Sequence, residues 1–278
     1  MAVRYEDRLM RVLHYICDNI SGDLSLDRLA DVAAMSRFHW HRVYHAMTGE
    51  TCAQTVRRMR LHVAAGRLLR EKTAVDTIAR EVGYDNPKSF AHAFRAAYGQ
   101  TPQAFRKNGR LDAPYLTLRD GREMTYPVEI RNADAVKVIG VPHTGPYMEI
   151  GRAFETLGTL LGARGLMAQC GPILGIYFDD VTAVPEAELR SMAGAVWKGG
   201  AVPEGFESAD LSGGRYAVLT FKGPYAQIEQ GYDELMGVWL PKSGEEPRDA
   251  PCYEIYLNDP RTTAPSDLLT EIHLPLVG

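Results

Sequence analysis

An internal repeat in the first hundred residues limits the folds available to this chain more than any other feature. Residues 29–57 read LADVAAMSRFHWHRVYHAMTGETCAQTVR, and residues 78–106 read IAREVGYDNPKSFAHAFRAAYGQTPQAFR. Four positions of each copy match at a constant spacing, namely Trp40, Tyr44, Gly49 and Thr51 in the first copy and Phe90, Phe94, Gly99 and Thr101 in the second. The pattern predicts that each copy folds as a helix, a tight turn and a second helix.

Length and composition narrow the class of protein. At 278 residues the chain is long enough for two domains with separate hydrophobic cores. No apolar run approaches the ~18 residues of a membrane-spanning helix, and charges interrupt the opening segment, so we expect neither a signal peptide nor a membrane partner. The four cysteines show no CxxC spacing, which favours reduced thiols in the cytoplasm over a metal site or a disulfide framework. We expect no cofactor.

Charge is distributed unevenly along the chain. Residues 1–108 carry 17 lysines and arginines against 11 acidic residues, whereas residues 109–278 carry 14 against 24. A basic segment joined to an acidic one suggests that only the first has a polyanion as its partner. The surplus is a weak signal alone, and it gains weight from the repeat that lies within the basic segment.

Capping residues and apolar spacing predict the helices of the basic segment. Residues 5–20 form an amphipathic helix, and Ser36 is suited to cap the second helix of the first copy. An arginine-rich helix follows over residues 53–71. The Thr73–Asp76 segment has the spacing of a capping box, and the Asn86–Pro87 pair marks a sharp helix start.

The second helix of each copy has two distinct faces. The face predicted to be buried carries apolar residues at i, i+4 and i+7, namely Trp40, Tyr44 and Met47 in the first copy and Phe90, Phe94 and Ala97 in the second. The opposite stripe lacks acids and is rich in hydrogen-bond donors, with Phe38, His41, Arg42 and His45 in the first copy and Lys88, Ala91, His92 and Arg95 in the second. Donors beside small apolar groups suit purine N7 and O6 and the thymine methyl group. The alternative is a solvated basic face.

A pattern specific to one family runs through the second copy. Its residues are Ile78-Ala79, Val82-Gly83-Tyr84-Asp85-Asn86, Ser89-Phe90, Phe94, Gly99, Thr101-Pro102 and Phe105-Arg106. On these residues the segment 5–108 resembles the AraC-family DNA-binding domain, which implies two recognition helices joined by a rigid linker helix. At ~1.5 Å per residue, residues 53–71 span about 28 Å, comparable to the ~34 Å between successive major-groove faces.

The resemblance also implies which residues contact DNA. The expected contact residues are Arg37, Phe38, His41, Arg42, His45, Lys88, Ser89, His92, Arg95 and Arg106. Arg57 and Arg106 are suited to phosphate contacts or to structural pairing, which position a protein on DNA without specifying a sequence. Histidine stands at several places where arginine or glutamine is more usual, so the family's base preference does not transfer to this chain.

A second internal repeat lies in the acidic segment. Residues 143–157, HTGPYMEIGRAFETL, match residues 221–235, FKGPYAQIEQGYDEL. Residues 175–180, GIYFDD, match residues 254–259, EIYLND. Each half is typical of a strand, a Gly-Pro-Tyr turn, a helix and a hairpin. We therefore expect two halves related by pseudo-two-fold symmetry, with a groove between them.

The two halves differ at one position that carries a charge. Glu254 aligns with Gly175, so one copy has a carboxylate where the other has no side chain. Strand alternation puts Glu254 and Tyr256 on one face and Ile255 and Leu257 on the opposite face, which suits the core. Glu254 is either an ordinary exposed acid or a buried counter-charge, and the strand alone favours exposure.

Aromatic residues around this asymmetric position favour a binding site. A pocket lined by aromatic rings with one carboxylate binds organic cations through ring quadrupoles and a single ion pair. The candidate ligand-binding residues are Glu254, Tyr147, Tyr177, Trp197, Tyr225 and Tyr256.

The acidic segment also resembles a known domain. The matching features are the two Gly-Pro-Tyr turns, Val128-Glu129-Ile130-Arg131 and Tyr253-Glu254-Ile255-Tyr256. On these features residues 125–278 resemble the GyrI-like small-molecule-binding domain, also found behind AraC-type DNA-binding domains in Rob-like regulators. The resemblance implies an effector pocket between the two halves, with Glu254 as its acid.

Together these patterns predict two domains. Residues 1–108 are expected to form an all-α tandem helix-turn-helix domain, and residues 109–124 a linker. Residues 125–278 are expected to form an α+β domain of two pseudo-symmetric strand-helix-hairpin repeats.

The leading hypothesis is a transcriptional regulator that is not an enzyme. Its first domain binds double-stranded DNA, its second binds a small hydrophobic or cationic effector, and RNA polymerase is a further candidate partner. The family suggests a multidrug or stress response. Two alternatives stay open. One is a GyrI-like hydrolase, with Glu254 as general base and Tyr147 or Tyr225 as donor. The other is a protein-interaction module.

Overall fold

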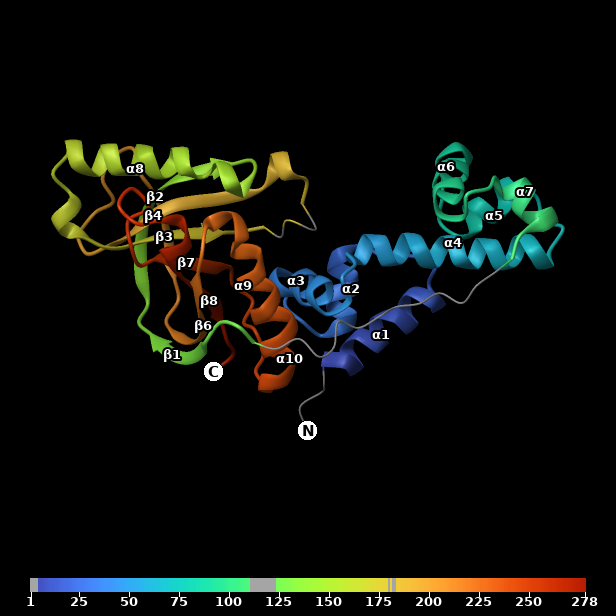
Figure 1. The fold of residues 1–278 in the computed structure, drawn as a ribbon, viewed down its shortest axis with the longest axis horizontal. Helices are drawn as coiled ribbons and strands as arrows, with labels where there is room; N and C mark the ends of the chain where they lie inside the picture. Colours follow the sequence, from blue (N-terminus) through green and yellow to red (C-terminus); the bar gives the residue numbers. More distant parts are fainter. Residues whose placement is uncertain (1–4, 111–123, 180, 182–183) are drawn as a thin grey trace. The chain divides into compact units, whose positions relative to one another are not determined.

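The computed structural model describes residues 5–110, 124–179, 181 and 184–278. Most of the predicted linker therefore lies outside the described residues. Those residues divide into two compact units: residues 5–35 join 48–110, and residues 36–47 join the strand-rich part of the chain. The predicted succession of an all-α region and an α+β region is confirmed (Figure 1).

The helices of the N-terminal region lie close to their predicted positions. Those within the described residues are α1 Tyr5–Asp18, α2 Leu26–Ala33, α3 Arg37–Thr48, α4 Cys52–Arg70, α5 Val75–Glu81, α6 Pro87–Tyr98 and α7 Pro102–Asn108. Asn86 caps α6 as predicted, because its side chain accepts a hydrogen bond from the Lys88 amide. The capping box predicted at Thr73–Asp76 is wrong. The helix α5 begins at Val75, and the Thr73 hydroxyl donates to Glu71 instead.

Aromatic side chains fill the core between α4, α5, α6 and α7. Phe90 and Phe94 are fully buried as predicted, and the Phe94 ring packs edge-on against Phe105 at a centroid distance of 5.3 Å. Ala97 is exposed, and Ala93 is buried in its place. The reason is helical geometry: Ala93 lies three residues after Phe90 and directly before Phe94, so it stands nearer the centre of the buried stripe.

The α+β unit is built on one antiparallel sheet. Its strands follow the order β1-β6-β8-β7-β3-β4-β2-β5. Their bounds are β1 Val128–Ala133, β2 Val136–Thr144, β3 Cys170–Tyr177, β4 Arg190–Trp197, β5 Glu207–Leu211, β6 Gly214–Lys222, β7 Cys252–Tyr256 and β8 Leu269–Pro275. Every strand except β5 coincides with a short β-like run of the sequence; these runs are VEIR, AVKVIGV, ILGIYF, GAVW, YAVLTF, CYEIYL and TEIHLPL.

The predicted repeat is present in the topology. One half contains β2, the helix α8 (Gly151–Ala163) and the β3–β4 hairpin. The other contains β6, the helix α9 (Ile228–Glu234) and the β7–β8 hairpin. A single π-helical turn, Leu235–Trp239, and the short helix α10, Leu240–Ser243, extend α9. The halves meet where β3 pairs with β7.

Strand register places Glu254 in an apolar row at the centre of the sheet. Glu254 pairs with Gly175 on one side and with Ile272 on the other. The row continues to Ala193 and Leu219, which face the helices: Ala193 packs in a core cluster with α8, and Leu219 lies beside Gly231 of α9. Glu254 therefore lies on the helix-covered face, at the junction of the two halves.

Candidate DNA-contact surface and effector site

The recognition stripe of α6 is open to solvent. Lys88, Ser89, His92 and Arg95 are all exposed, as expected for DNA contacts. The side chains of Lys88 and Arg95 make no ion pair or hydrogen bond among the residues that the structure describes. Unpaired cations on one helix face are the electrostatic signature of a surface that binds a polyanion.

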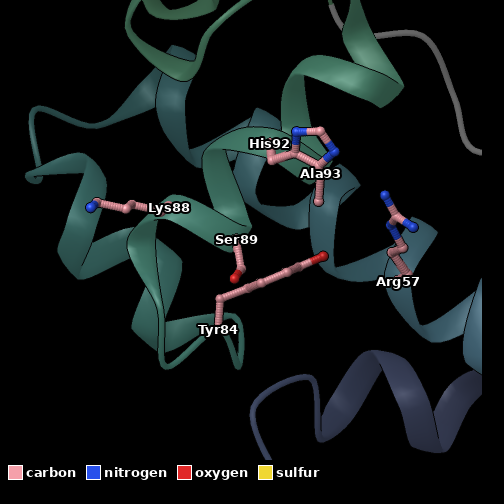
Figure 2. A pocket seen from close by; sticks show the side chains of 6 residues that line it. All are labelled: Arg57, Tyr84, Lys88, Ser89, His92 and Ala93. Atoms are coloured by element: carbon pink, nitrogen blue, oxygen red, sulfur yellow. The ribbon is translucent and has the colours of Figure 1, made fainter.

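A depression of about 560 Å³ lies beside this stripe, and α4 contributes to it. Its lining residues are Arg57, Tyr84, Lys88, Ser89, His92 and Ala93. Figure 2 shows the Tyr84 side chain extending from beside Ser89 toward Arg57. Arg57 is exposed, whereas Arg58 is paired with Glu50 at 3.0 Å. A phosphate group fits such a mixture of cationic and hydroxyl donors.

The Arg106 side chain makes a hydrogen bond within the protein. Its guanidinium donates to the Thr73 carbonyl oxygen, which ties α7 to the segment before α5. This hydrogen bond agrees with the structural role considered for Arg106, and the phosphate contact of Arg57 stays a prediction.

The recognition stripe of α3 differs from that of α6. Arg37 is the one exposed residue of α3 as the structure describes it, and its guanidinium lies 5.1 Å from the Phe38 ring centroid. His41 is 6% exposed, and Phe38, Arg42 and His45 are partly buried. In this conformation α3 does not present the stripe that the sequence predicts for DNA.

The Glu254 carboxylate is buried and surrounded by tyrosine hydroxyl groups. It is 4% exposed, so the exposed alternative is wrong. Tyr232 donates to Oε1 and Tyr256 donates to Oε2, each at 3.0 Å. The Tyr177 hydroxyl lies 2.8 Å from that of Tyr256. Because the Tyr256 proton goes to Glu254, the Tyr177 proton goes to Tyr256.

Aromatic rings pack around these hydroxyl groups. The ring of Tyr256 lies edge-on to Phe154 of α8, at a centroid distance of 5.3 Å, and to Tyr225, at 5.4 Å. The Tyr147 ring packs against Tyr177 at 4.8 Å, while its hydroxyl donates to the Asp179 carbonyl oxygen at 2.8 Å. Rings that flank a carboxylate in this way suit a cation with an apolar body.

Burial changes the ionisation of this cluster. Desolvation raises the pKa of the Glu254 carboxyl from its ordinary value of 4.5 to about 7, although hydrogen bonds from Tyr232 and Tyr256 and the charge of Arg42 act in the opposite direction. No lysine or arginine forms an ion pair with Glu254 within the described residues. Burial also raises the pKa values of Tyr177, Tyr232 and Tyr256 well above 10.

The predicted ligand-binding residues are brought together with one exception. Glu254, Tyr147, Tyr177, Tyr225 and Tyr256 form one connected cluster. Trp197 instead ends β4, where it pairs with Cys170 and its indole donates to the Gly200 carbonyl oxygen. Leu257, predicted to face the core, is 49% exposed because β7 ends at Tyr256.

Sequence reasoning missed Tyr232, although the repeat contains the signal for it. Tyr232 occupies the position in its half that Phe154 occupies in the other half. The carboxylate and a hydroxyl that donates to it are therefore both present in the same copy. Glycine at 175 has a matching cause, because a Cβ there would lie 2.9 Å from the Tyr256 hydroxyl and 3.0 Å from that of Tyr177.

Comparison with known proteins agrees with this two-part organisation. Residues 126–277, more than half of the chain, match the family model of the GyrI-like small-molecule-binding domain. The chain belongs to the GyrI-like family. Residues 29–108 match a helix-turn-helix domain of the AraC type. The GyrI-like domain thus follows an AraC-type domain, as the sequence patterns predict. No helix within the described ranges is long and apolar enough to cross a membrane.

Two curated relatives match part of this chain. The bifunctional transcriptional activator and DNA repair enzyme AdaA of Bacillus subtilis (strain 168) is 32% identical over 104 residues, which cover 37% of this chain and 49% of AdaA. The RCS-specific transcriptional activator RclR of Escherichia coli (strain K12) is 32% identical over 107 residues, or 38% of each chain. This chain therefore spans half or less of the length of these two relatives.

A solved structure resembles part of this chain. The crystal structure of the EcmrR C-terminal domain is 17% identical, with a TM-score of 0.44, and the match covers 55% of this chain and 99% of that chain.

Proposed function

We propose that this chain is a transcriptional regulator that binds DNA through its two recognition helices and a cationic aromatic effector at Glu254. The exposed and unpaired cations of α6, together with Arg57, support the first part. The relatives AdaA and RclR are named as transcriptional activators, which supports regulation of transcription as the outcome of DNA binding. RNA polymerase as a partner stays a prediction.

One observation carries the effector assignment. Glu254 is buried in an apolar row of the sheet, is hydrogen-bonded to tyrosines, and forms no ion pair within the described part of the chain. A buried carboxylate that forms no ion pair is costly in its ionised form, and a bound cation reduces that cost. The surrounding rings of Tyr225, Tyr256 and Phe154 provide the apolar and quadrupolar contacts. A response to lipophilic cations, of the kind that drugs present, follows from this chemistry.

A pair of probes that differ only in charge tests this assignment. Thermal unfolding of the full chain is followed with benzamidine, a flat aromatic cation, and with benzamide, its neutral counterpart. Stabilisation by a ligand grows as RT ln(1 + [L]/Kd), about 2.7 kcal/mol when [L] is 100 Kd. We expect benzamidine to stabilise the wild type, benzamide to have little effect, and Glu254→Gln to remove the benzamidine response. Glu207→Gln, an exposed acid on β5, is the control.

The same experiment separates the alternatives. An equal response to benzamidine in wild type and Glu254→Gln overturns the assignment of Glu254. A response to neither benzamidine nor the larger cation tetraphenylphosphonium favours a protein-interaction role for the α+β unit. The hydrolase alternative requires turnover of an electrophilic substrate that Glu254→Gln abolishes.

DNA binding is tested independently of any effector. The affinity of the full chain for a duplex recovered from a randomised pool is measured as a function of salt concentration. Each phosphate contact that is lost reduces the slope of log K against log salt by about 1. We expect this reduction in Arg57→Ala, and not in Arg58→Ala, because Arg58 is already paired with Glu50. An unchanged slope in Arg57→Ala contradicts the phosphate contact.

A further inference from the structure

The helix α3 is held along its length by the α+β part of its own unit. At its start, the Ser36 hydroxyl donates to Asp249 Oδ1 at 2.6 Å. One turn later His39 is 1% exposed, and its Nε2 lies 3.0 Å from the Arg248 carbonyl oxygen. Burial lowers the pKa of His39 to about 4, so the ring is neutral near pH 7 and Nε2–H donates this hydrogen bond.

Near the end of α3 the contact becomes tight backbone packing. A Cβ placed on Gly237, in the π-helical turn, would lie 2.7 Å from the Ala46 Cβ and 2.9 Å from the Ala46 carbonyl oxygen. Only glycine permits this approach, because the atom in the way is backbone and does not rotate aside. The contacting residues Ser36, His39 and Ala46 follow helical spacing, so one face of α3 is seated on this surface.

Arg42 lies in the middle of the same contact and reaches the effector cluster. Its guanidinium carbon lies 4.6 Å from the centroid of the Tyr232 ring. Its Nη2 donates to the Asp179 carbonyl oxygen at 3.3 Å, the same oxygen that accepts from the Tyr147 hydroxyl. Tyr232 in turn donates to Glu254. A cation–π contact of the kind that an organic cation needs is thus already made by a side chain of the recognition helix.

The same arginine is a predicted DNA contact, and it cannot serve both partners at once. We propose that Arg42 is an internal ligand of the effector site, and that a bound aromatic cation displaces it from Tyr232 and frees α3 to bind DNA. This inference rests on the proposed cation binding at Glu254. It identifies the effector class as flat cations that resemble a guanidinium group. It also gives the direction of regulation: the effector strengthens DNA binding, and by linkage DNA strengthens effector binding by the same factor.

Removal of the internal ligand is the first test. The affinity of the full chain for benzamidine is measured by calorimetry in wild type, Arg42→Gln and Arg37→Gln. Arg37 is the matched control, because it lies on the same helix and is exposed. Loss of a competitor raises affinity, so we expect Arg42→Gln to bind benzamidine about 5- to 20-fold more tightly, within the usual range of coupling between two sites. Arg37→Gln is expected to match the wild type.

The second test uses a substitution that weakens the seating of α3 and changes neither the DNA-contact residues nor the effector site. Gly237→Ala places a methyl group against the Ala46 backbone, whereas Gly158→Ala on α8 is a control with open space around its Cβ. We expect Gly237→Ala to bind the selected duplex without effector as tightly as wild type saturated with benzamidine. Should Gly237→Ala fail to fold, Asp249→Ala removes the Ser36 contact at an exposed position and is expected to act in the same direction.

The outcomes separate this inference from the proposed function. Equal benzamidine affinity in wild type and Arg42→Gln overturns the internal ligand and leaves effector binding at Glu254 intact. No binding of benzamidine or tetraphenylphosphonium by any variant overturns both. The release of α3 is overturned if Gly237→Ala binds DNA with wild-type affinity and shows the full enhancement by benzamidine. If Gly237→Ala does not fold, the same result in Asp249→Ala overturns it. This conclusion does not depend on the identity of the effector.

Discussion

The helices α3 and α6 are copies of one another, yet they have opposite environments. Both bury aromatic residues at matching positions, with Trp40 and Tyr44 in α3 and Phe90 and Phe94 in α6. The donor stripe of α6 is exposed, while that of α3 is largely covered. One substitution accounts for part of this difference: Arg42 stands where the second copy has His92. An arginine reaches Tyr232 and Asp179, which the shorter histidine side chain does not.

The two halves of the α+β unit differ in a parallel way. The half that contains α8 has Gly175 and Phe154, and the half that contains α9 has Glu254 and Tyr232 at the equivalent positions. The added groups meet each other, because Tyr232 donates to Glu254 and its ring receives Arg42. The two copies of a repeat share the residues that build the fold. The positions at which the copies differ can therefore carry the polar groups of a binding site. Here the divergent positions of both repeats converge on one site.

The largest expected effect comes from removing the charge that distinguishes the two halves. Burial raises the pKa of Glu254 from 4.5 to about 7, so between these values the folded chain binds a proton that the unfolded chain has lost. The free energy of unfolding therefore falls as pH rises through this window, by up to about 3 kcal/mol at 1.36 kcal/mol per pKa unit. We expect Glu254→Gln to unfold in urea with wild-type stability at pH 4.5 and to be about 3 kcal/mol more stable at pH 8.

The pH profile is the decisive readout, because a simple packing change shifts stability equally at both pH values. Glu207→Gln, on the exposed edge strand β5, provides the baseline for loss of a surface carboxylate. A Glu254→Gln variant whose stability follows the wild-type profile from pH 4.5 to 8 is incompatible with a carboxylate that is destabilised by burial.

The next largest effect is expected for a substitution on α6, the recognition helix whose donor stripe is exposed. Arg95 on α6 is exposed and expected to contact DNA in every state of the protein. Charge reversal in Arg95→Glu removes a contact worth about 1–3 kcal/mol and adds repulsion from the phosphates, so we expect a loss of DNA affinity on the order of 100-fold. The loss is the same with and without benzamidine in fluorescence anisotropy titrations. A loss confined to the benzamidine-bound protein assigns α6, rather than α3, to the regulated surface.

A smaller effect on DNA affinity is expected for a substitution on α3, the recognition helix whose donor stripe is largely covered. Arg37 begins α3 and is a predicted base contact, so Arg37→Ala removes an interaction worth about 1–2 kcal/mol once α3 is released. We expect about a 10-fold loss of DNA affinity when benzamidine is saturating and less than a 2-fold loss without it. The same titrations as for Arg95→Glu supply the data. An equal loss in both conditions shows that α3 binds DNA without release.

Sequence patterns predict most of this fold because it is repetitive and strongly patterned. Capping residues such as Asn86 and the Gly-Pro-Tyr turns act locally, so their positions in the sequence are sufficient. The strand β5 escapes prediction because it is a short edge strand, ESADL, that pairs with β2 and has little apolar alternation. The second repeat predicts the candidate site, because it identifies Glu254 and the tyrosines around it. A comparison of Phe154 with Tyr232 at the equivalent position would have added Tyr232 to this list. The contact of Arg42 with Tyr232 has no local signature, because it depends on tertiary packing of α3.

The smallest expected effect on stability concerns two helix caps that occupy matching positions in the two copies of the N-terminal repeat. Thr51 caps α4 in a full capping box, in which the Gln54 amide donates to Thr51 Oγ1 at 3.1 Å and the Thr51 amide donates to Gln54 Oε1 at 2.7 Å. Thr101 caps α7 with one such bond, to the Ala104 amide at 3.2 Å, because alanine has no side-chain acceptor to return. Loss of a threonine cap costs about 1 kcal/mol. We expect Thr101→Ala and Thr51→Ala each to cost about this much in urea unfolding, because each variant loses the one hydrogen bond that the threonine side chain accepts, while the backbone amide at position 51 stays in place. We expect Gln54→Ala to cost only a few tenths of this amount, because it removes the bond from the Thr51 amide. An unchanged stability in Gln54→Ala would show that the reciprocal bond contributes nothing.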